Sequence, residues 1–437
     1  MRILFLTDNF PPEVNAPAAR THVHCKAWVE AGHEVTVITC APNFPQGRVY
    51  EGYRNRLRQT EIVDGIRVVR VWSYMAPNAG FGRRIADYLS FAFSATVAGL
   101  GEEFDVLVAT SPQFFTAVAA SVLSHLKRRP WVFEIRDLWP ESIIAAGAME
   151  RGTVVEALER LELGLYRSAD QIVAVTRSFR ENLVGRGVDP RKVRVIRNGV
   201  DTEAFDPPVP RNGNGPFRVG YLGTHGMAHG LDLVLRTAPR FEPGEVEFEL
   251  IGDGARKAEL VEEARRRALP NVRFRDPVPR ERIAEVLGGF DACLVPLRDT
   301  PTFRSVIPSK IFEAAAARRP ILLGVRGEAE DLVREYEAGL VFTPESEEEL
   351  AGAIESLRTR PDLYTRLQEG GARLAADFER GRLAAEMLSG LEGLVPGSAP
   401  RGSARGRGDG GEVEPEGAPS SSPPAPSPGS SRSTARS

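Results

Sequence analysis

The chain has 437 residues with 42% hydrophobic and 26% charged side chains, a composition typical of a soluble globular protein with two large domains. Its net charge of -3 gives no global attraction to nucleic acid. Three scattered thiols, Cys25, Cys40 and Cys293, support neither a disulfide framework nor a zinc knuckle, and no apolar run reaches the roughly 18 residues that cross a bilayer. We therefore expect a cytoplasmic protein without a membrane-spanning segment.

Two sets of short apolar runs alternate with helical patterns along the chain. The first set of predicted strands covers residues 3–6, 34–39, 66–71, 106–109, 131–135, 171–175 and 193–196. The second set covers residues 217–222, 247–251, 272–274, 292–297, 320–323 and 339–342. Alternation of this kind indicates βαβ units, so the sequence predicts an α/β protein with two doubly wound parallel sheets.

Changes in composition predict the boundaries between segments. We expect a first domain at residues 1–205, a linker at 206–216, a second domain at 217–375, and a helix at 376–395 that packs back on the first domain. Residues 396–437 contain almost no large apolar side chain, so we predict a disordered tail there. Open α/β sheets bind ligands at the carboxyl ends of their strands, so the cleft between two such domains is the expected site.

Residues 305–320 are the most informative stretch. Pro308 and the helix formers after it predict a helix at 309–318, directly after the strand at 292–297 and its loop. Unpaired backbone N–H groups at the start of this helix would attract an anion, and Lys310 adds a formal positive charge. Glu313 lies one turn further on, where it can accept hydrogen bonds from ribose hydroxyls. An ordinary surface helix with a Lys–Glu pair is the alternative.

Two glycine-containing turns follow the first two predicted strands of the second domain. They contain Gly223, Thr224, His225 and His229 in the first turn, and Gly252, Asp253 and Gly254 in the second. Glycine allows a ligand to approach the backbone closely, and the two histidines can donate to phosphate oxygens. A metal-binding histidine pair is the alternative, but no third ligand is evident and the nearby glycines favour a loop.

Further motifs occur in a fixed order over roughly residues 1–390. They are VIRNGVDTEAF, the YLG and IGDG turns, NVRFRDPVPRERI, FDACLVPL and PSKIFEAAAARRPIL. In this order they resemble the family 4 glycosyltransferases, the large retaining group with the two-domain GT-B architecture. DNFPPEVNAPAAR, AGHEVTVIT and RDLWPES are similar to the branch that assembles O-antigen and other bacterial surface polysaccharides, close to the fucosamine transferase subgroup. The resemblance implies two Rossmann-like domains and an inter-domain cleft.

The resemblance also implies where the donor binds, in the second domain. The expected donor-binding residues are Gly223, Thr224, His229, Gly252, Asp253, Gly254, Val278, Ser305, Ile307, Pro308, Ser309 and Glu313. Lys310, with His225, would stabilise the departing diphosphate. The family has two glutamates eight residues apart, and here Ser305 replaces the first of them. Sugar recognition would therefore pass to Ser305 and to neighbouring backbone amides.

The acceptor would bind the first domain, which the resemblance implies as well. Asp137 follows the strand at 131–135 and would orient the acceptor hydroxyl or the sugar. Family members often have a His–Asp pair here, whereas this chain has Arg136 and Asp137. The alternative for Asp137 is a helix cap or a partner of Arg136. Asn15 and Arg20 form a second acceptor candidate, in which Arg20 grips a phosphate with two nitrogens, and Glu141 is a weaker one.

A stripe of apolar residues occupies residues 81–100. Two arginines, Arg83 and Arg84, precede its members Ile85, Leu89, Phe93, Val97 and Leu100. A stripe at this spacing usually faces the core, which is the interpretation we favour. The alternative is a face that enters a membrane surface to meet a polyprenyl-linked acceptor.

These patterns predict a retaining, metal-independent glycosyltransferase of hexosyltransferase type. Its donor would be a nucleotide diphosphate sugar, uridine-linked and carrying an N-acetylated amino sugar, and its acceptor a lipid-linked or other saccharide. No Asp-x-Asp motif is present. A sugar-nucleotide 2-epimerase and a catalytically silent sugar-nucleotide binder are the alternatives. A nicotinamide-dependent oxidoreductase is disfavoured, because the first βα turn lacks a GxGxxG fingerprint.

Overall fold

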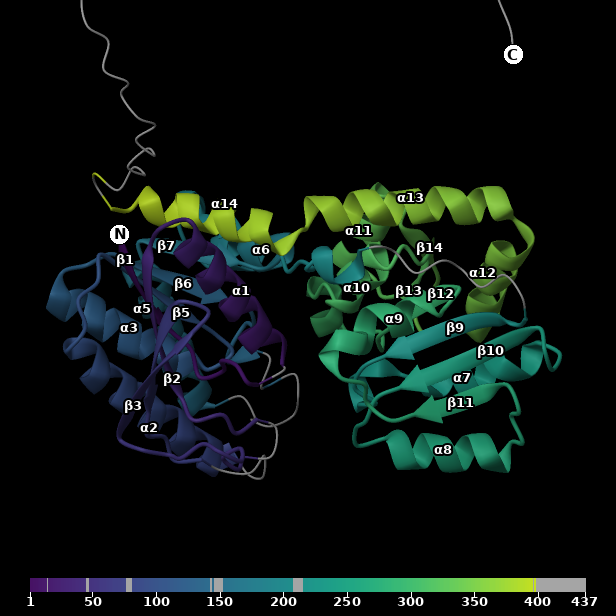
Figure 1. Cartoon of the computed structure of the whole chain (residues 1–437), viewed down its shortest axis with the longest axis horizontal. Helices are drawn as coiled ribbons and strands as arrows, with labels where there is room; N and C mark the ends of the chain where they lie inside the picture. Colours follow the sequence, from purple (N-terminus) through teal and green to yellow (C-terminus); the bar gives the residue numbers. More distant parts are fainter. Residues whose placement is uncertain are drawn as a thin grey trace, which may run out of the picture. The chain divides into compact units, whose positions relative to one another are not determined.

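The computed structural model describes residues 1–13, 15–44, 47–75, 81–141, 144, 152–206, 215–395 and 397. Most of the predicted linker at 206–216 and nearly all of the predicted tail at 396–437 lie outside the described residues. The described chain forms two α/β sheets, each covered by helices, and all pairs but one edge pair of the first sheet are parallel (Figure 1). The predicted fold class is therefore confirmed.

The first sheet has eight strands within the described residues, in the order β3-β4-β2-β1-β5-β6-β7-β8. They are β1 (Arg2–Leu6), β2 (Glu34–Cys40), β3 (Arg58–Val63), β4 (Ile66–Val71), β5 (Val106–Thr110), β6 (Trp131–Ile135), β7 (Gln171–Ala174) and β8 (Val193–Val195). The central strand β1 pairs in parallel with both neighbours, so that Ile3 lies opposite Val35 on one side and Val106 on the other. Strand order therefore reverses between β1 and β5, at the middle of the sheet.

Strand β3 was not predicted from the sequence. It forms an antiparallel hairpin with β4 at the edge of the sheet, joined by Asp64 and Gly65. Both turn residues have positive φ, 48° for Asp64 and 79° for Gly65, which is the conformation that a two-residue hairpin loop requires. The Asp–Gly pair was the sequence feature from which this hairpin could have been predicted.

Successive side chains of each strand point to opposite faces of the first sheet. Both faces of this sheet are apolar, and helices cover both. The helices are α1 (Ala16–Glu30), α2 (Phe81–Leu100), α3 (Phe114–Lys127), α5 (Thr153–Ser168) and α6 (Arg177–Gly185). Leu4 and Leu6 of β1 pack in a core with α2, α3 and α5, whereas Ile3 and Phe5 pack in the opposite core with α1. The sheet is thus buried on both sides.

The second sheet has the order β11-β10-β9-β12-β13-β14 in the described part of the chain, with all strands parallel. They are β9 (Phe217–Leu222), β10 (Val246–Ile251), β11 (Val272–Arg275), β12 (Ala292–Pro296), β13 (Ile321–Gly324) and β14 (Gly339–Val341). When its strands are numbered 1 to 6 along the chain, the order is 3-2-1-4-5-6, which is that of dinucleotide-binding doubly wound sheets. The order reverses between β9 and β12.

Seven α-helices of the described chain accompany the second sheet. They are α7 (Asp232–Thr237), α8 (Lys257–Arg266), α9 (Ile283–Gly288), α10 (Lys310–Ala316), α11 (Glu328–Glu335), α12 (Glu347–Thr359) and α13 (Pro361–Asp377). Short 3-10 helices connect other elements, namely η1 (Pro190–Lys192), η2 (Glu203–Phe205), η3 (Met227–His229), η4 (Ala238–Arg240), η5 (Arg280–Arg282) and η6 (Pro301–Ser305).

The last helix, α14 (Arg380–Glu392), leaves the second sheet and packs on the first. It follows α13, which contacts α10, and it lies against α1 (Figure 1). Trp28 of α1 donates its indole N–H to the carbonyl of Ala384 at 2.9 Å, and Met387 joins the core that contains Phe5. The end of the described chain is therefore part of the first domain's core.

Ile85 of the apolar stripe on α2 packs against the core, but the other four members do not face it, so the interpretation that we favoured from the sequence is wrong for them. Leu89, Phe93, Val97 and Leu100 are exposed to 48%, 71%, 55% and 44%. The buried side of α2 is instead formed by smaller residues and one aromatic ring, namely Phe91, Ala92, Ala95 and Ala98. Periodicity identified an apolar row correctly, but it does not say which of two apolar rows meets the sheet.

Replacing Met387 by Ala should destabilise the protein by about 2–5 kcal/mol, because it removes a buried side chain from the core between α14 and β1. Urea unfolding measures the loss. The exposed Glu386→Ala on the same helix is the control and should change stability by less than about 0.5 kcal/mol. Equal stability of the two variants would contradict the packing of α14.

Candidate active site

The carboxyl ends of β9 and β12 mark the switch point of the second sheet. The loop after β9 begins at Gly223, and the loop after β12 leads through η6 to Lys310 at the start of α10. Ligands of doubly wound sheets bind in the crevice at this point. The topology therefore brings together two segments that the sequence separated by more than eighty residues.

Glycine backbones hold the loops after β9 and β10 in direct contact. The amide of Gly223 donates to the carbonyl of Ile251 at 2.9 Å, and the amide of His225 donates to that of Asp253 at 2.8 Å. A Cβ on Gly252 would lie 1.9 Å from the carbonyl oxygen of Gly223. Gly252 also has φ of +144°, which side chains rarely tolerate. No other residue fits at this position without moving the backbone.

Lys310 reaches across to this pair of loops. Its Nζ lies 5.3 Å from the centroid of the Tyr221 ring, and a Cβ on Gly223 would lie 2.8 Å from the same nitrogen. Burial lowers the pKa of Lys310, and the charge of Glu313 opposes that shift. Within the part of the chain that the structure describes, Nζ has no ion-pair partner closer than 4 Å. The ammonium is therefore available to an anion beside Gly223.

Glu313 follows one turn into α10, among positive charges that come from its own helix and from other elements. Burial raises the pKa of its carboxyl, while Arg380, Lys310 and Arg280 act in the opposite direction. Neither Arg280 nor Arg380 was predicted from the sequence. Arg280 stands in the NVRFRDPVPRERI motif, which was a usable signal, but Arg380 arrives from α14 and no local pattern marks it.

His225 and His229 lie in the loop after β9, and both rings pack near Tyr221, with centroids 5.8 and 6.0 Å from it. Burial lowers the pKa of His225, and it lowers that of His229 to about 4, so both imidazoles are neutral near neutral pH. His225 is fully buried, and neither ring nitrogen has a hydrogen-bond partner among the described residues. A neutral imidazole offers one N–H donor and one acceptor to a ligand.

A metal-binding pair was the alternative interpretation of these two histidines. In the described ranges of the chain, no three His, Cys, Asp or Glu side chains are arranged to hold a metal ion. The carboxylate of Asp253 accepts from the amide of Gly254 at 2.8 Å, so it stabilises its own turn.

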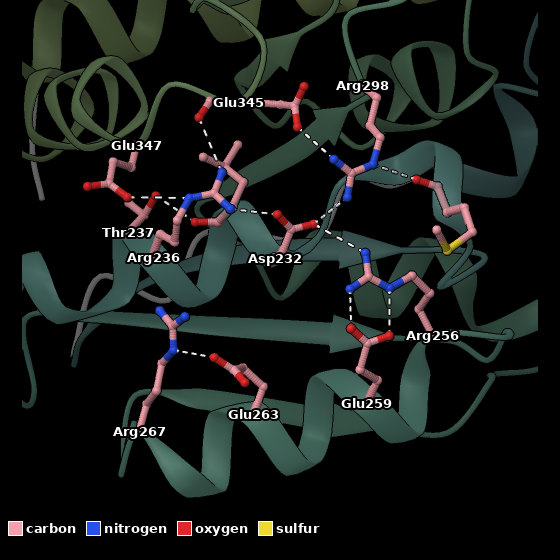
Figure 2. Close-up of polar contacts among 12 residues, drawn as sticks. Asp232, Arg236, Thr237, Arg256, Glu259, Glu263, Arg267, Arg298, Glu345 and Glu347 are labelled. Carbon is pink, nitrogen blue, oxygen red and sulfur yellow. Dashed lines mark hydrogen bonds and ion pairs between the residues drawn. The ribbon is translucent and has the colours of Figure 1, made fainter.

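An arginine network centred on Asp232 fixes the outer side of the loops (Figure 2). Asp232 accepts from Arg298 at 2.9 Å and from Arg236 at 2.5 Å, and it lies 3.5 Å from Arg256. Arg298 also donates to the carbonyl of Met227 at 3.0 Å. Partial burial alone would raise the pKa of Asp232, but the hydrogen bond from Arg236 and the charge of Arg298 lower it. The network thus joins the loops after β9, β10 and β12.

The remaining predicted donor residues lie around the start of α10. Ser305 ends η6 and donates to the carbonyl of Thr302 at 3.0 Å, and Ile307 is buried in the second domain's core. Helix α10 begins at Lys310, one residue after the predicted start, and the carbonyls of Pro308 and Ser309 accept from its first-turn amides. Val278 is partly buried against the same core as Ile307.

Asp137 lines two cavities at the carboxyl edge of the first sheet. One has a volume of about 250 Å³ and brings Asp137 and Glu141 together with Ser305 and Thr302 of the second domain. The other has a volume of about 330 Å³, and Asp137 and Asn15 are among its lining residues. Three predicted acceptor or catalytic residues, Asp137, Glu141 and Asn15, therefore adjoin cavities.

The larger cavity is acidic, which the sequence analysis did not predict. Asp8, Glu13 and Asp87 line it. Burial raises the pKa of Asp8 to about 6, and the charge of Glu13 adds to the shift. One oxygen of Glu13 accepts from the amides of Asn43 and Phe44, at 2.7 and 2.9 Å, while the other has no partner among the residues described here. The polar side chains directly after the first strand were the sequence feature from which this acidic cavity could have been predicted.

Arg20 has a set of internal partners that the sequence did not reveal. Its Nε donates to Glu134 at 2.8 Å, and its terminal nitrogens donate to the carbonyls of Arg197 and Ile196, at 2.7 and 3.0 Å. The side chain is buried, so these contacts connect β6 with the segment after β8. Its predicted phosphate contact stays a prediction.

Asn15 and Arg136 also have local partners. Asn15 caps α1 by accepting from the amide of Ala18 at 2.9 Å. Burial lowers the pKa of Arg136 to about 10, and one of its terminal nitrogens has no hydrogen-bond partner within the described chain. The backbone amides of Arg136 and Asp137 donate to the hydroxyl of Ser111, at 2.7 and 3.2 Å, which fixes the turn after β6.

Two family descriptions match the chain. The glycosyl transferase 4-like domain matches residues 15–199, and the group 1 glycosyl transferases match residues 216–360. The chain belongs to the family 4 glycosyltransferases. The resemblance inferred from the sequence motifs and the enzyme class are thereby confirmed.

Curated relatives of this glycosyltransferase cover most of its length. It is 25% identical to WcaI of Escherichia coli, named as a colanic acid biosynthesis glycosyl transferase, over 71% of this chain and 80% of WcaI. It is also 25% identical to the glycogen synthase of Mycobacterium tuberculosis, over 87% of this chain and 91% of the synthase.

Solved structures agree in fold. HepE of Anabaena, solved in complex with UDP and glucose, matches with a TM-score of 0.65 and 17% identity over 90% of this chain and 100% of HepE. The sucrose-phosphate synthase of Thermosynechococcus elongatus matches with a TM-score of 0.72 and 16% identity over 90% of this chain and 98% of the synthase. These likenesses establish the GT-B fold.

Gly252→Ala should destabilise the second domain, because the added Cβ meets the carbonyl of Gly223 and the residue has positive φ. Gly244→Ala is the matched control, since Gly244 has φ of +91° but nothing within 4 Å of its Cβ position. Backbone strain alone costs about 1–3 kcal/mol in either variant. Thermal unfolding should therefore show a larger loss for Gly252→Ala, and equal losses would contradict the loop contact.

Proposed function

We propose that this enzyme transfers a sugar, with retention of configuration and without a metal cofactor, from a nucleotide diphosphate sugar to a lipid-linked or other saccharide in bacterial surface polysaccharide synthesis. The observation that carries the proposal is the ammonium of Lys310 beside Gly223, at the switch point of the second sheet. A diphosphate bound there would meet the formal charge of Lys310 and, in the loop after β9, the neutral imidazole of His229.

A uridine diphosphate sugar is the proposed donor, with an N-acetylated amino sugar as the transferred unit. HepE, which has the same fold, was solved with UDP and glucose, and this supports a uridine nucleotide. Glu313 would accept from the ribose hydroxyls, and the backbone near Val278 would contact the base. Ser305 would contact the sugar in place of the glutamate that the family has at this position.

The main requirement of the proposed reaction is that the enzyme stabilises the leaving group. Sugar transfer passes through an oxocarbenium-like state while negative charge builds on the departing diphosphate, and preorganised positive charge stabilises that state. Lys310 supplies this charge, and His225 would donate a hydrogen bond once its buried ring turns toward the ligand. The acceptor hydroxyl attacks on the face that the diphosphate leaves, and its proton passes to a diphosphate oxygen, so no enzyme nucleophile is needed.

The acceptor would occupy the first domain. Asp137 would orient its attacking hydroxyl, because this residue borders both the larger cavity and the smaller one that Ser305 lines. The carboxylates of Asp8 and Glu13 would accept from sugar hydroxyls. The relationship to WcaI supports a polysaccharide intermediate as acceptor, and a polyprenyl-linked form would be met at the cytoplasmic face of the membrane.

Lys310→Ala should weaken UDP binding by about 1–3 kcal/mol, the worth of a charge-assisted contact, as measured by titration calorimetry. Uridine lacks the diphosphate, so its affinity should not change. Lys192→Ala, on the first domain, is the control for removal of a lysine. Unchanged affinity of the Lys310→Ala variant for UDP would refute the diphosphate role.

A panel of nucleotide diphosphate sugars, screened first by thermal shift and then by turnover, tests the function itself. Turnover with the stabilising donor should persist in EDTA, and NMR of the product should show the anomeric configuration of the donor. Loss of turnover in EDTA that added Mg²⁺ restores would contradict metal independence. An inverted product would contradict retention, and stabilisation by a donor without transfer to any saccharide would favour the silent binder.

A further inference from the structure

Helix α2 has an exposed apolar face with no partner among the described residues. The α2 face consists of Leu89, Phe93, Val97 and Leu100, which lie within one side of the helix at spacings of three and four residues. All four side chains are exposed, and the opposite side of the helix packs on the sheet through Phe91 and the alanines around it. Four large apolar side chains in one row are more than the scattered exposed residues of an ordinary surface.

We propose that the α2 face binds the surface of an anionic lipid bilayer and thereby presents the larger cavity of the first domain to a lipid-linked acceptor. The inference rests on the proposed function for the identity of that acceptor. An amphipathic helix of this kind lies in the plane of the interface with its apolar row among the acyl chains. In the ranges that the structure describes, no helix is long and apolar enough to cross a membrane.

The charges near the α2 face suit a bilayer with anionic headgroups. Arg83 and Arg84 are exposed in the first turn, whereas the helix carries no charged side chain from residue 88 to residue 100. The acidic residue of the helix, Asp87, is half-buried and accepts from the hydroxyl of Ser73 at 2.7 Å. The exposed charges at this end of the apolar row are therefore positive, whereas Glu103, exposed beyond the other end, pairs with Arg2.

The backbone of an exposed tyrosine lies beside the same helix. Tyr74 is exposed, and its amide donates to the hydroxyl of Ser90 at 2.7 Å. Arginine and tyrosine at the end of an apolar row are typical of an interfacial segment, because their apolar parts lie along the acyl chains while their polar ends stay in water.

Helix α2 also forms a wall of the larger cavity. Arg84, Asp87 and Tyr88 line that cavity, and Arg84 donates to the hydroxyl of Tyr88 at 3.1 Å. Leu89 follows Tyr88 directly but lies on the exposed side. One turn of α2 thus separates the cavity from the α2 face, so a saccharide on a lipid carrier can enter the cavity while its carrier stays in the bilayer.

Vesicle sedimentation tests the proposal with the full chain. The wild type should bind vesicles of phosphatidylcholine and phosphatidylglycerol in equal amounts, and bind pure phosphatidylcholine more weakly. Leu89→Asp combined with Phe93→Asp should reduce binding at least about tenfold, because two apolar side chains no longer enter the interface. Val261→Asp is the control, since Val261 is 41% exposed on α8 of the second domain. Arg83→Glu should weaken binding to the anionic vesicles alone.

Two further measurements separate the outcomes. Circular dichroism and calorimetry with UDP should show that the double variant folds and binds UDP normally. The Lys310→Ala variant should still bind vesicles. Failure of the donor site and failure of the α2 face are therefore distinguishable. Wild type that binds neither vesicle, or a double variant that binds as well as wild type, would overturn the proposal. A wild-type dimer in ultracentrifugation that the double variant abolishes would overturn it in favour of a second copy.

Discussion

Close contact between glycine backbones is the constraint on which the candidate site depends. Gly252 and Gly254 touch the carbonyls of Gly223 and His225, so the loops after β9 and β10 meet with no side chain between them. Lys310 fills the space beside Gly223 and brings a formal charge to the switch point of the sheet. Any side chain at these glycines would separate the loops, and the geometry around the lysine would be lost with them.

The two sheets share the strand order of their central parallel strands but differ in charge at their carboxyl ends. In the second sheet the charges of Arg380, Lys310 and Arg280 all act on Glu313, a setting that favours a diphosphate. In the first sheet Asp8 and Glu13 line the cavity, a setting that repels phosphate and suits the hydroxyls of a saccharide. Two domains of similar fold can therefore bind two chemically different ligands.

Local pattern predicted the fold well, because buried parallel strands are short apolar runs that the sequence displays directly. It missed β3, an edge strand whose signal was the Asp64–Gly65 turn, and it assigned the stripe on α2 to the core. For the site, the glycine loops and Lys310 were found because motifs mark them. The internal partner of Arg20, Glu134, lies 114 residues away, and Arg380 comes from the last helix, so only the assembled fold reveals either contact.

Hydrogen exchange with and without UDP is the sharpest test of a diphosphate site at Lys310, since it reports on backbone amides rather than on a substituted side chain. UDP should slow exchange in three segments, residues 222–230, 251–256 and 306–313, which lie far apart in sequence. The segments that line the acidic cavity of the first domain should not change. Protection confined to the first domain, or absent from residues 306–313, would contradict a diphosphate site at Lys310.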